Sequence, residues 1–120
     1  MSHASAAELV ARCFAARTAA HFAHLKCRKY ACHIALGEFY DALVDVVDAF
    51  AECYQGVFGV IPSYPDVGVP SGELTPIKEL REWLVAHRSA AAQGQRELEN
   101  LIDEITAHCD RTIYKIVNLS

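Results

Sequence analysis

The chain has 120 residues, of which 52% are hydrophobic and 22% charged, and its formal net charge is −4. This length fits one hydrophobic core, so we expect a single domain over residues 1–120. The hydrophobic content excludes a disordered chain, and the negative charge excludes a broadly basic nucleic-acid-binding surface. The sequence has neither the roughly 18-residue apolar run of a membrane span nor the pattern of a signal peptide, which predicts a cytoplasmic protein without a membrane partner.

The five cysteines show neither the C-x-x-C pattern nor the spacing of a zinc finger. Cysteine is among the most buried residue types. We therefore interpret the cysteines as reduced thiols that fill the core, not as redox groups. They are Cys13, Cys27, Cys32, Cys53 and Cys109.

Apolar residues recur at helical spacing in four segments. We expect the first helix to be capped near Ser5 and the second to end at Gly56. A stretch that contains all four prolines then predicts a loop of roughly 20 residues, after which Thr75 caps a third helix. Gly94 separates the third helix from the fourth. The predicted helices span about 5–29, 30–55, 76–91 and 95–117.

Four helices with one long connection predict an all-α fold, namely a four-helix bundle of ferritin-like connectivity. A short link would make the second and third helices antiparallel neighbours, whereas a loop of this length can cross the full length of a bundle. The prediction is therefore a single ferritin-like helical domain with a long crossover between helices two and three.

The first two helices carry opposite charges. Every charged residue of the second helix is acidic, whereas the first helix carries five basic residues and one acid. We interpret Glu38, Asp41 and Asp45 as part of a solvated face that attracts the basic helix. A nucleic-acid-binding role for the basic residues is disfavoured by the net charge. These residues are Arg12, Arg17, Lys26, Arg28 and Lys29.

Four polar residues stand apart from this surface: His21, His33, Asp48 and Glu52. On a helical wheel the last three lie beside the apolar stripe of the second helix. Imidazole nitrogen and carboxylate oxygen together suit Fe(II), Mn(II) or Zn(II), and acids at i,i+4 can bind one ion. However, His33 and Asp48 are separated by about 22 Å along a helix, so one ion cannot contact both within one chain.

Two copies of the second helix, antiparallel about a two-fold axis near residues 40–43, would solve this problem. His33 of one copy would then lie opposite Asp48 and Glu52 of the other. We expect a stripe of small or modest side chains to let the helices approach, with the metal site at the interface. The stripe comprises Gly37, Val44 and Ala51.

The same four residues, over the same two helices, resemble the ferroxidase pattern of the Dps family, the starvation-induced DNA-protecting mini-ferritins. The resemblance implies that His21, His33, Asp48 and Glu52 bind iron and catalyse its oxidation at a two-fold subunit interface. It further implies a homo-oligomer, at least a dimer and in that family a hollow dodecamer. From the donor atoms themselves, zinc or manganese could substitute for iron. Phe22 stands where the family usually has Trp, and the family's basic N-terminal tail is missing.

The segment from His21 to Gly56 also resembles small uncharacterised bacteriophage proteins. The alternative hypothesis is therefore a non-enzymatic helical dimerisation or interaction module, phage-encoded, whose histidines are structural. His24 lies one turn from His21 and could be an extra ligand, but we interpret it as a supporting or surface residue.

Overall fold

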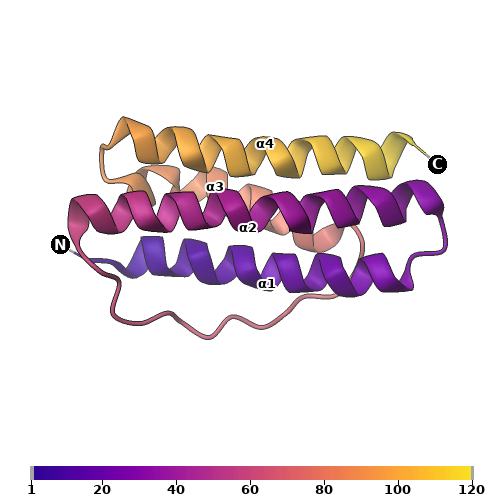
Figure 1. The fold of residues 1–120 in the computed structure, drawn as a ribbon, viewed down its shortest axis with the longest axis horizontal. Helices are drawn as coiled ribbons and strands as arrows, with labels where there is room; N and C mark the ends of the chain where they lie inside the picture. Colours follow the sequence, from indigo (N-terminus) through magenta and orange to yellow (C-terminus); the bar gives the residue numbers. More distant parts are fainter. Residues whose placement is uncertain (1, 120) are drawn as a thin grey trace.

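The computed structural model describes residues 2–119, so both end residues of the expected domain lie outside the described range. It confirms an all-α four-helix bundle (Figure 1). None of these helices combines the length and the apolar character needed to cross a membrane. The helices are α1 (Ala4–Lys26), α2 (Tyr30–Phe58), α3 (Thr75–Ala92) and α4 (Arg96–Asn118).

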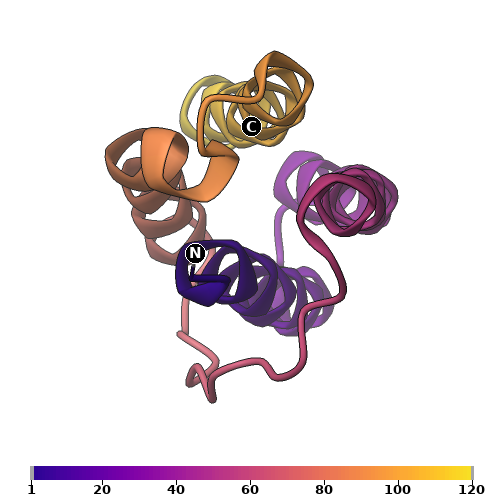
Figure 2. The same cartoon turned by 90° about the vertical axis from the view of Figure 1, so that its left-hand side faces the viewer.

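A long crossover joins α2 to α3, as expected. Both α1 and α4 pack against α2 and against α3, so α2 and α3 lie diagonally across the bundle (Figure 2). The crossover, residues 59–74, runs along the outside of α1 (Figure 1). An extended segment of this length reaches at most about 55 Å, and the longest extent of the molecule is 45 Å. The segment is therefore long enough to cross the whole bundle, which is the connectivity of ferritin-like bundles.

The ends of the first two helices differ from the predicted ones. Helix α1 ends at Lys26, three residues early, because Cys27 is extended with φ −69° and ψ 134°. Helix α2 continues through Gly56 and ends at Phe58. The terminating residue is Gly59, whose φ of 94° favours glycine. The predicted end at Gly56 was wrong. A glycine lowers helix propensity, but a helix ends only where the backbone leaves the helical conformation, and Gly56 keeps that conformation.

The expected caps also shift. His3 precedes α1 and Leu74 precedes α3, and neither makes a side-chain capping hydrogen bond. Leu74 is already in the right-handed helical region, so Thr75 is the first helical residue instead of the cap. Ser5 likewise lies inside α1. Gly94 does separate α3 from α4, with a φ of 83°.

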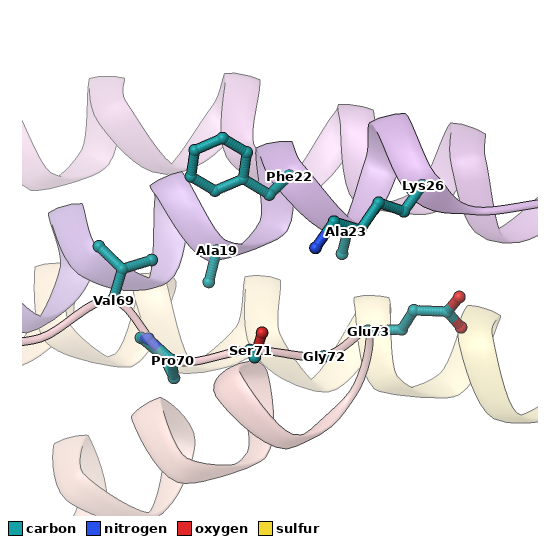
Figure 3. Close-up of a pocket in the computed structure, with 9 residues that line it drawn as sticks. All are labelled: Ala19, Phe22, Ala23, Lys26, Val69, Pro70, Ser71, Gly72 and Glu73. Atoms are coloured by element: carbon teal, nitrogen blue, oxygen red, sulfur yellow. The ribbon is translucent and has the colours of Figure 1, made fainter.

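Helix α1 is covered on most sides, which explains its many alanines. It contacts α2, α3 and the crossover, and seven of its buried residues are alanine. Small side chains let the crossover approach α1 while still filling the core. A groove of about 580 Å³ lies between the two, lined by Ala19, Phe22 and Ala23 of α1 and by residues 69–73 (Figure 3).

The cysteines divide into two groups. Cys13, Cys32 and Cys109 are buried, as expected, and all five are free thiols. Burial raises the pKa of the Cys109 thiol to about 12, so this thiol stays protonated at neutral pH. Cys27 is half-buried and Cys53 is exposed, so the interpretation as core filler is wrong for Cys53.

Tyr54 closes the end of the core near the N-terminus. Its side chain is fully buried, and its hydroxyl oxygen accepts a hydrogen bond from Gln93 Nε2 at 3.0 Å. The hydroxyl also lies 2.9 Å from His3 Nδ1. One buried hydroxyl therefore links α2, the turn after α3 and the residue before α1.

We expect Tyr54→Phe to lower the free energy of unfolding by about 1–2 kcal/mol, because it leaves the Gln93 and His3 side chains without their shared partner. Tyr64→Phe, which removes a hydroxyl from an exposed tyrosine of the crossover, should change stability by less than about 0.5 kcal/mol. Urea denaturation measures both. Equal losses in the two variants would contradict the role of the Tyr54 hydroxyl.

Candidate functional site

A cluster of aromatic side chains lies where the second half of α1 meets the first half of α2. His21 and His24 are one turn apart on α1, and His33 and Tyr40 are two turns apart on α2. The His24 and His33 rings stack with centroids 3.7 Å apart, and His21 stacks on Tyr40 at 4.2 Å. His24 also contacts Tyr40 edge-on at 5.4 Å. We call His21, His24, His33 and Tyr40 the histidine cluster.

Two reciprocal hydrogen bonds hold the centre of the cluster. His24 Nδ1 lies 2.6 Å from the His33 carbonyl oxygen, and His33 Nδ1 lies 2.8 Å from the His24 carbonyl oxygen. A carbonyl oxygen can only accept, so both Nδ1 atoms must carry protons. In the neutral rings the lone pair is then on Nε2, which is the tautomer of a histidine ready to bind a metal through Nε2.

Gly37 makes room for this arrangement. A Cβ atom at this position would lie 3.1 Å from His24 Cε1 and 3.2 Å from His24 Nδ1. The small size of Gly37 therefore serves a contact within the chain, and the expectation that it admits a second copy of α2 needs correction. The glycine allows α1 to place an imidazole directly against the backbone of α2.

The acidic residues of the predicted site lie elsewhere on α2. Asp48 and Glu52 are exposed, and within residues 2–119 neither carboxylate has an ion-pair or hydrogen-bond partner. Fifteen helical residues separate Asp48 from His33, which is about 22 Å along the axis. The structure thus brings His21 and His33 to one cluster through His24, and leaves Asp48 and Glu52 apart from it in the same chain.

One group of three metal-ligating side chains does converge within the described part of the chain, and the sequence did not indicate it. It consists of Cys27, Cys32 and Glu73, whose ligand atoms lie within 4.8 Å of one another. The spacing of the two cysteines matches no common zinc motif, and Glu73 is distant from them in sequence. No sequence pattern therefore connects the three residues. His24, interpreted from the sequence as a supporting or surface residue, lies at the centre of the histidine cluster, where its carbonyl oxygen holds the His33 ring.

Substituting Gly37 tests the contact with His24. Gly56→Ala, on the same helix and with open space around it, should stabilise the protein by about 0.5–1 kcal/mol through helix propensity. Gly37→Ala should gain less stability than Gly56→Ala, or lose stability. The new Cβ atom would push the His24 ring away from the His33 carbonyl oxygen, to which its Nδ1 atom is hydrogen-bonded. Denaturation curves and the NMR signals of the His24 ring report the two effects. An equal gain in both variants, with unshifted His24 signals, would show that Gly37 is not needed.

Comparison with known proteins identifies a family for most of the chain. The model of a family of unknown function, DUF5856, matches residues 24–116, which include His24, His33, Asp48 and Glu52 but not His21. No curated protein and no solved structure shows significant similarity to the chain. Because the match covers more than three quarters of the sequence, the chain belongs to the DUF5856 family.

Proposed function

We propose that the protein is a Dps-like ferroxidase and iron-sequestering protein that binds Fe(II) at a site shared between two copies of the chain. One observation carries the proposal: the His33 ring is held by its Nδ1 atom on the His24 carbonyl, which leaves Nε2 as the lone-pair donor. A histidine oriented in this way is preorganised to bind a metal.

The remaining ligands come from the second copy. Because Asp48 and Glu52 lie about 22 Å from His33 along α2, an antiparallel pair of α2 helices places the acids of one copy near the histidine of the other. Each dimer then has two equivalent sites. The carboxylates are exposed, and within residues 2–119 neither is paired, so both are available to an ion.

In this site Fe(II) is the substrate. His21 and His33 provide nitrogen ligands, Asp48 bridges and Glu52 provides the second carboxylate, while zinc or manganese can occupy the same donors. Two Fe(II) ions lose one electron each, and one hydrogen peroxide takes both electrons with two protons to give two waters. With dioxygen as the oxidant, the same two electrons and two protons give hydrogen peroxide. The Fe(III) product is retained by the oligomer.

A second candidate is a non-enzymatic dimerisation or interaction module with structural histidines. Apolar side chains exposed near the α1–α2 turn favour it, with Phe22 54%, Leu25 68% and Tyr30 78% exposed. In this alternative the reciprocal hydrogen bonds of His24 and His33 serve only to hold α1 against α2. Both candidates include self-association, and only the first includes iron chemistry.

Val44→Glu tests self-association through α2. Val44 is half-buried on α2 beside the proposed two-fold axis near residues 40–43, so a charge there should split the oligomer into monomers. Asp45→Asn, on the next residue of the same helix, is the control and should leave the assembly intact. Light scattering measures the native mass and so shows whether each variant is an oligomer or a monomer. An unchanged mass for a folded Val44→Glu protein would show that this seam is wrong.

Complementation tests the shared site. His33→Ala and Asp48→Ala should each abolish Fe(II) oxidation, because each removes a ligand from both sites of a homodimer. Refolded together, they form heterodimers with one intact site, which predicts about half the wild-type activity per heterodimer. The measurement is the rate of Fe(III) formation with hydrogen peroxide.

Two further variants control this experiment. His33→Gln keeps a donor for the His24 carbonyl but removes the imidazole, so it should fold like the wild type and remain inactive. Asp45→Ala, on the solvated face, should retain activity. No recovery in mixtures whose subunits demonstrably exchange would refute the shared site.

A further inference from the structure

The group formed by Cys27, Cys32 and Glu73, here called the thiol cluster, lies at the end of the bundle away from Tyr54. Cys27 is the first residue after α1, Cys32 is in the first turn of α2, and Glu73 precedes α3 by two residues. Cys32 Sγ lies 3.4 Å from Glu73 Oε2, and the ligand atoms of all three residues lie within 4.8 Å of one another.

The topology explains why these residues meet. The crossover has to return to the end of the bundle where α1 ends and α2 begins, because α3 starts there (Figure 1). Figure 3 shows the last part of the crossover beneath α1, with the Glu73 side chain directed toward the end of α1. Gly72, with a φ of 122°, turns the backbone immediately before Glu73.

The backbone around Cys27 adds to this placement. The extended conformation of Cys27 ends α1 and turns its side chain into the short link to α2, where Sγ lies 3.4 Å from the Lys29 carbonyl oxygen. Cys32 is in the first turn of α2 and is buried. The two sulfur atoms thus come from opposite sides of the same turn.

Two thiols and a carboxylate form a donor set that suits Zn²⁺. In a tetrahedral zinc site with bonds of 2.0–2.3 Å, neighbouring ligand atoms lie roughly 3.3–3.8 Å apart. The separation of Cys32 Sγ and Glu73 Oε2 is already in this range, and the remaining separations need to close by at most about 1–1.5 Å. Side-chain rotation is enough for a movement of this size.

The surroundings leave a fourth position open. A cavity of about 540 Å³ adjoins the thiol cluster and reaches the end of α4 at Ile116 and Val117. Water or a small ligand can complete the coordination from this side. Lys26, Arg28 and Lys29 also line the cavity, and their charges balance the net negative charge of a zinc ion bound by two thiolates and a carboxylate.

The Cys32 thiol holds its proton in the metal-free chain. Burial raises the pKa of Cys32 to about 12, and the facing Cys27 and Glu73 side chains add to the rise. Zinc binding therefore has to release protons, as it does at other thiolate sites. The same high pKa disfavours Cys32 as a reactive nucleophile.

We propose that Cys27, Cys32 and Glu73 bind one Zn²⁺ ion that fastens the end of the crossover to the α1–α2 turn. Such an ion would join the end of α1, the start of α2 and the end of the crossover. Along the chain, 40 residues separate Cys32 from Glu73. The site is independent of the proposed iron site, since the two share no residue.

The test uses the whole 120-residue chain, reduced and handled without oxygen so that no disulfide can form. Titration with Cd²⁺, which binds like zinc and gives an ultraviolet thiolate charge-transfer band, should reach saturation at one ion per chain. Competition with a chromophoric chelator measures the affinity for Zn²⁺. We expect Cys27→Ser and Cys32→Ser to abolish the band or weaken zinc binding at least about 100-fold, and Glu73→Gln at least about tenfold.

Matched controls separate this site from other groups. Cys53→Ser removes an exposed cysteine, Glu82→Gln an exposed acid of α3, and His33→Ala a ligand of the proposed iron site. All three should keep the cadmium band and the zinc affinity of the wild type. Zinc should also raise the Tm of the wild type and of these controls, and raise it by less in Cys27→Ser and Glu73→Gln.

The proposal is overturned if the reduced wild type gives no charge-transfer band, or if Cys27→Ser, which changes a half-buried side chain and should fold normally, binds zinc as well as the wild type does. Loss of binding in Cys53→Ser would overturn it too. An unaffected Glu73→Gln would remove the link to the crossover and with it the proposed role. Because His33→Ala is among the controls, failure here is distinguishable from failure of the iron site.

Discussion

The length of the connection between α2 and α3 is the constraint on which much of this structure depends. The crossover has to travel from the end of α2 to the opposite end of the bundle, and it does so along α1. Helix α1 is therefore covered by two helices and by the crossover. Large side chains on α1 would keep these neighbours farther from its backbone. Its buried alanines let the layers approach, and close approach provides the dispersion contacts of a dense core.

The same constraint brings Glu73 to the end of the bundle where α1 turns into α2, and other polar groups lie at this end. The reciprocal hydrogen bonds of His24 and His33 bracket this turn, and the thiol cluster lies directly at it. Each neutral hydrogen bond contributes only about 1 kcal/mol to stability. Their larger effect is to fix the rings, since a stacked pair with both Nδ1 atoms bonded has little freedom to rotate.

A structural role and a ligand role are compatible for these histidines. Metal-binding histidines commonly donate one ring nitrogen to a backbone carbonyl and bind the ion with the other. His33 has the first of these features in the single chain, and Asp48 and Glu52 would have to come from a second copy.

The sequence alone determined the parts of this protein that depend on local periodicity and composition. Apolar spacing predicted the four helices, and the prolines and glycines after α2 predicted the long crossover, because both features act over a few neighbouring residues. The helix ends were less predictable, and Gly56 shows that a glycine inside a well-packed helix need not end it.

Only the tertiary structure decided which side chains meet. His24 became the centre of a cluster because Gly37 on the neighbouring helix leaves space for its ring, a relation between residues that no single periodicity contains. Glu73 joined Cys27 and Cys32 because the crossover ends beside the α1–α2 turn. Such contacts depend on the path of the whole chain, whereas sequence patterns report the conformation of short segments, and for that reason the helices were predictable while the thiol cluster was not.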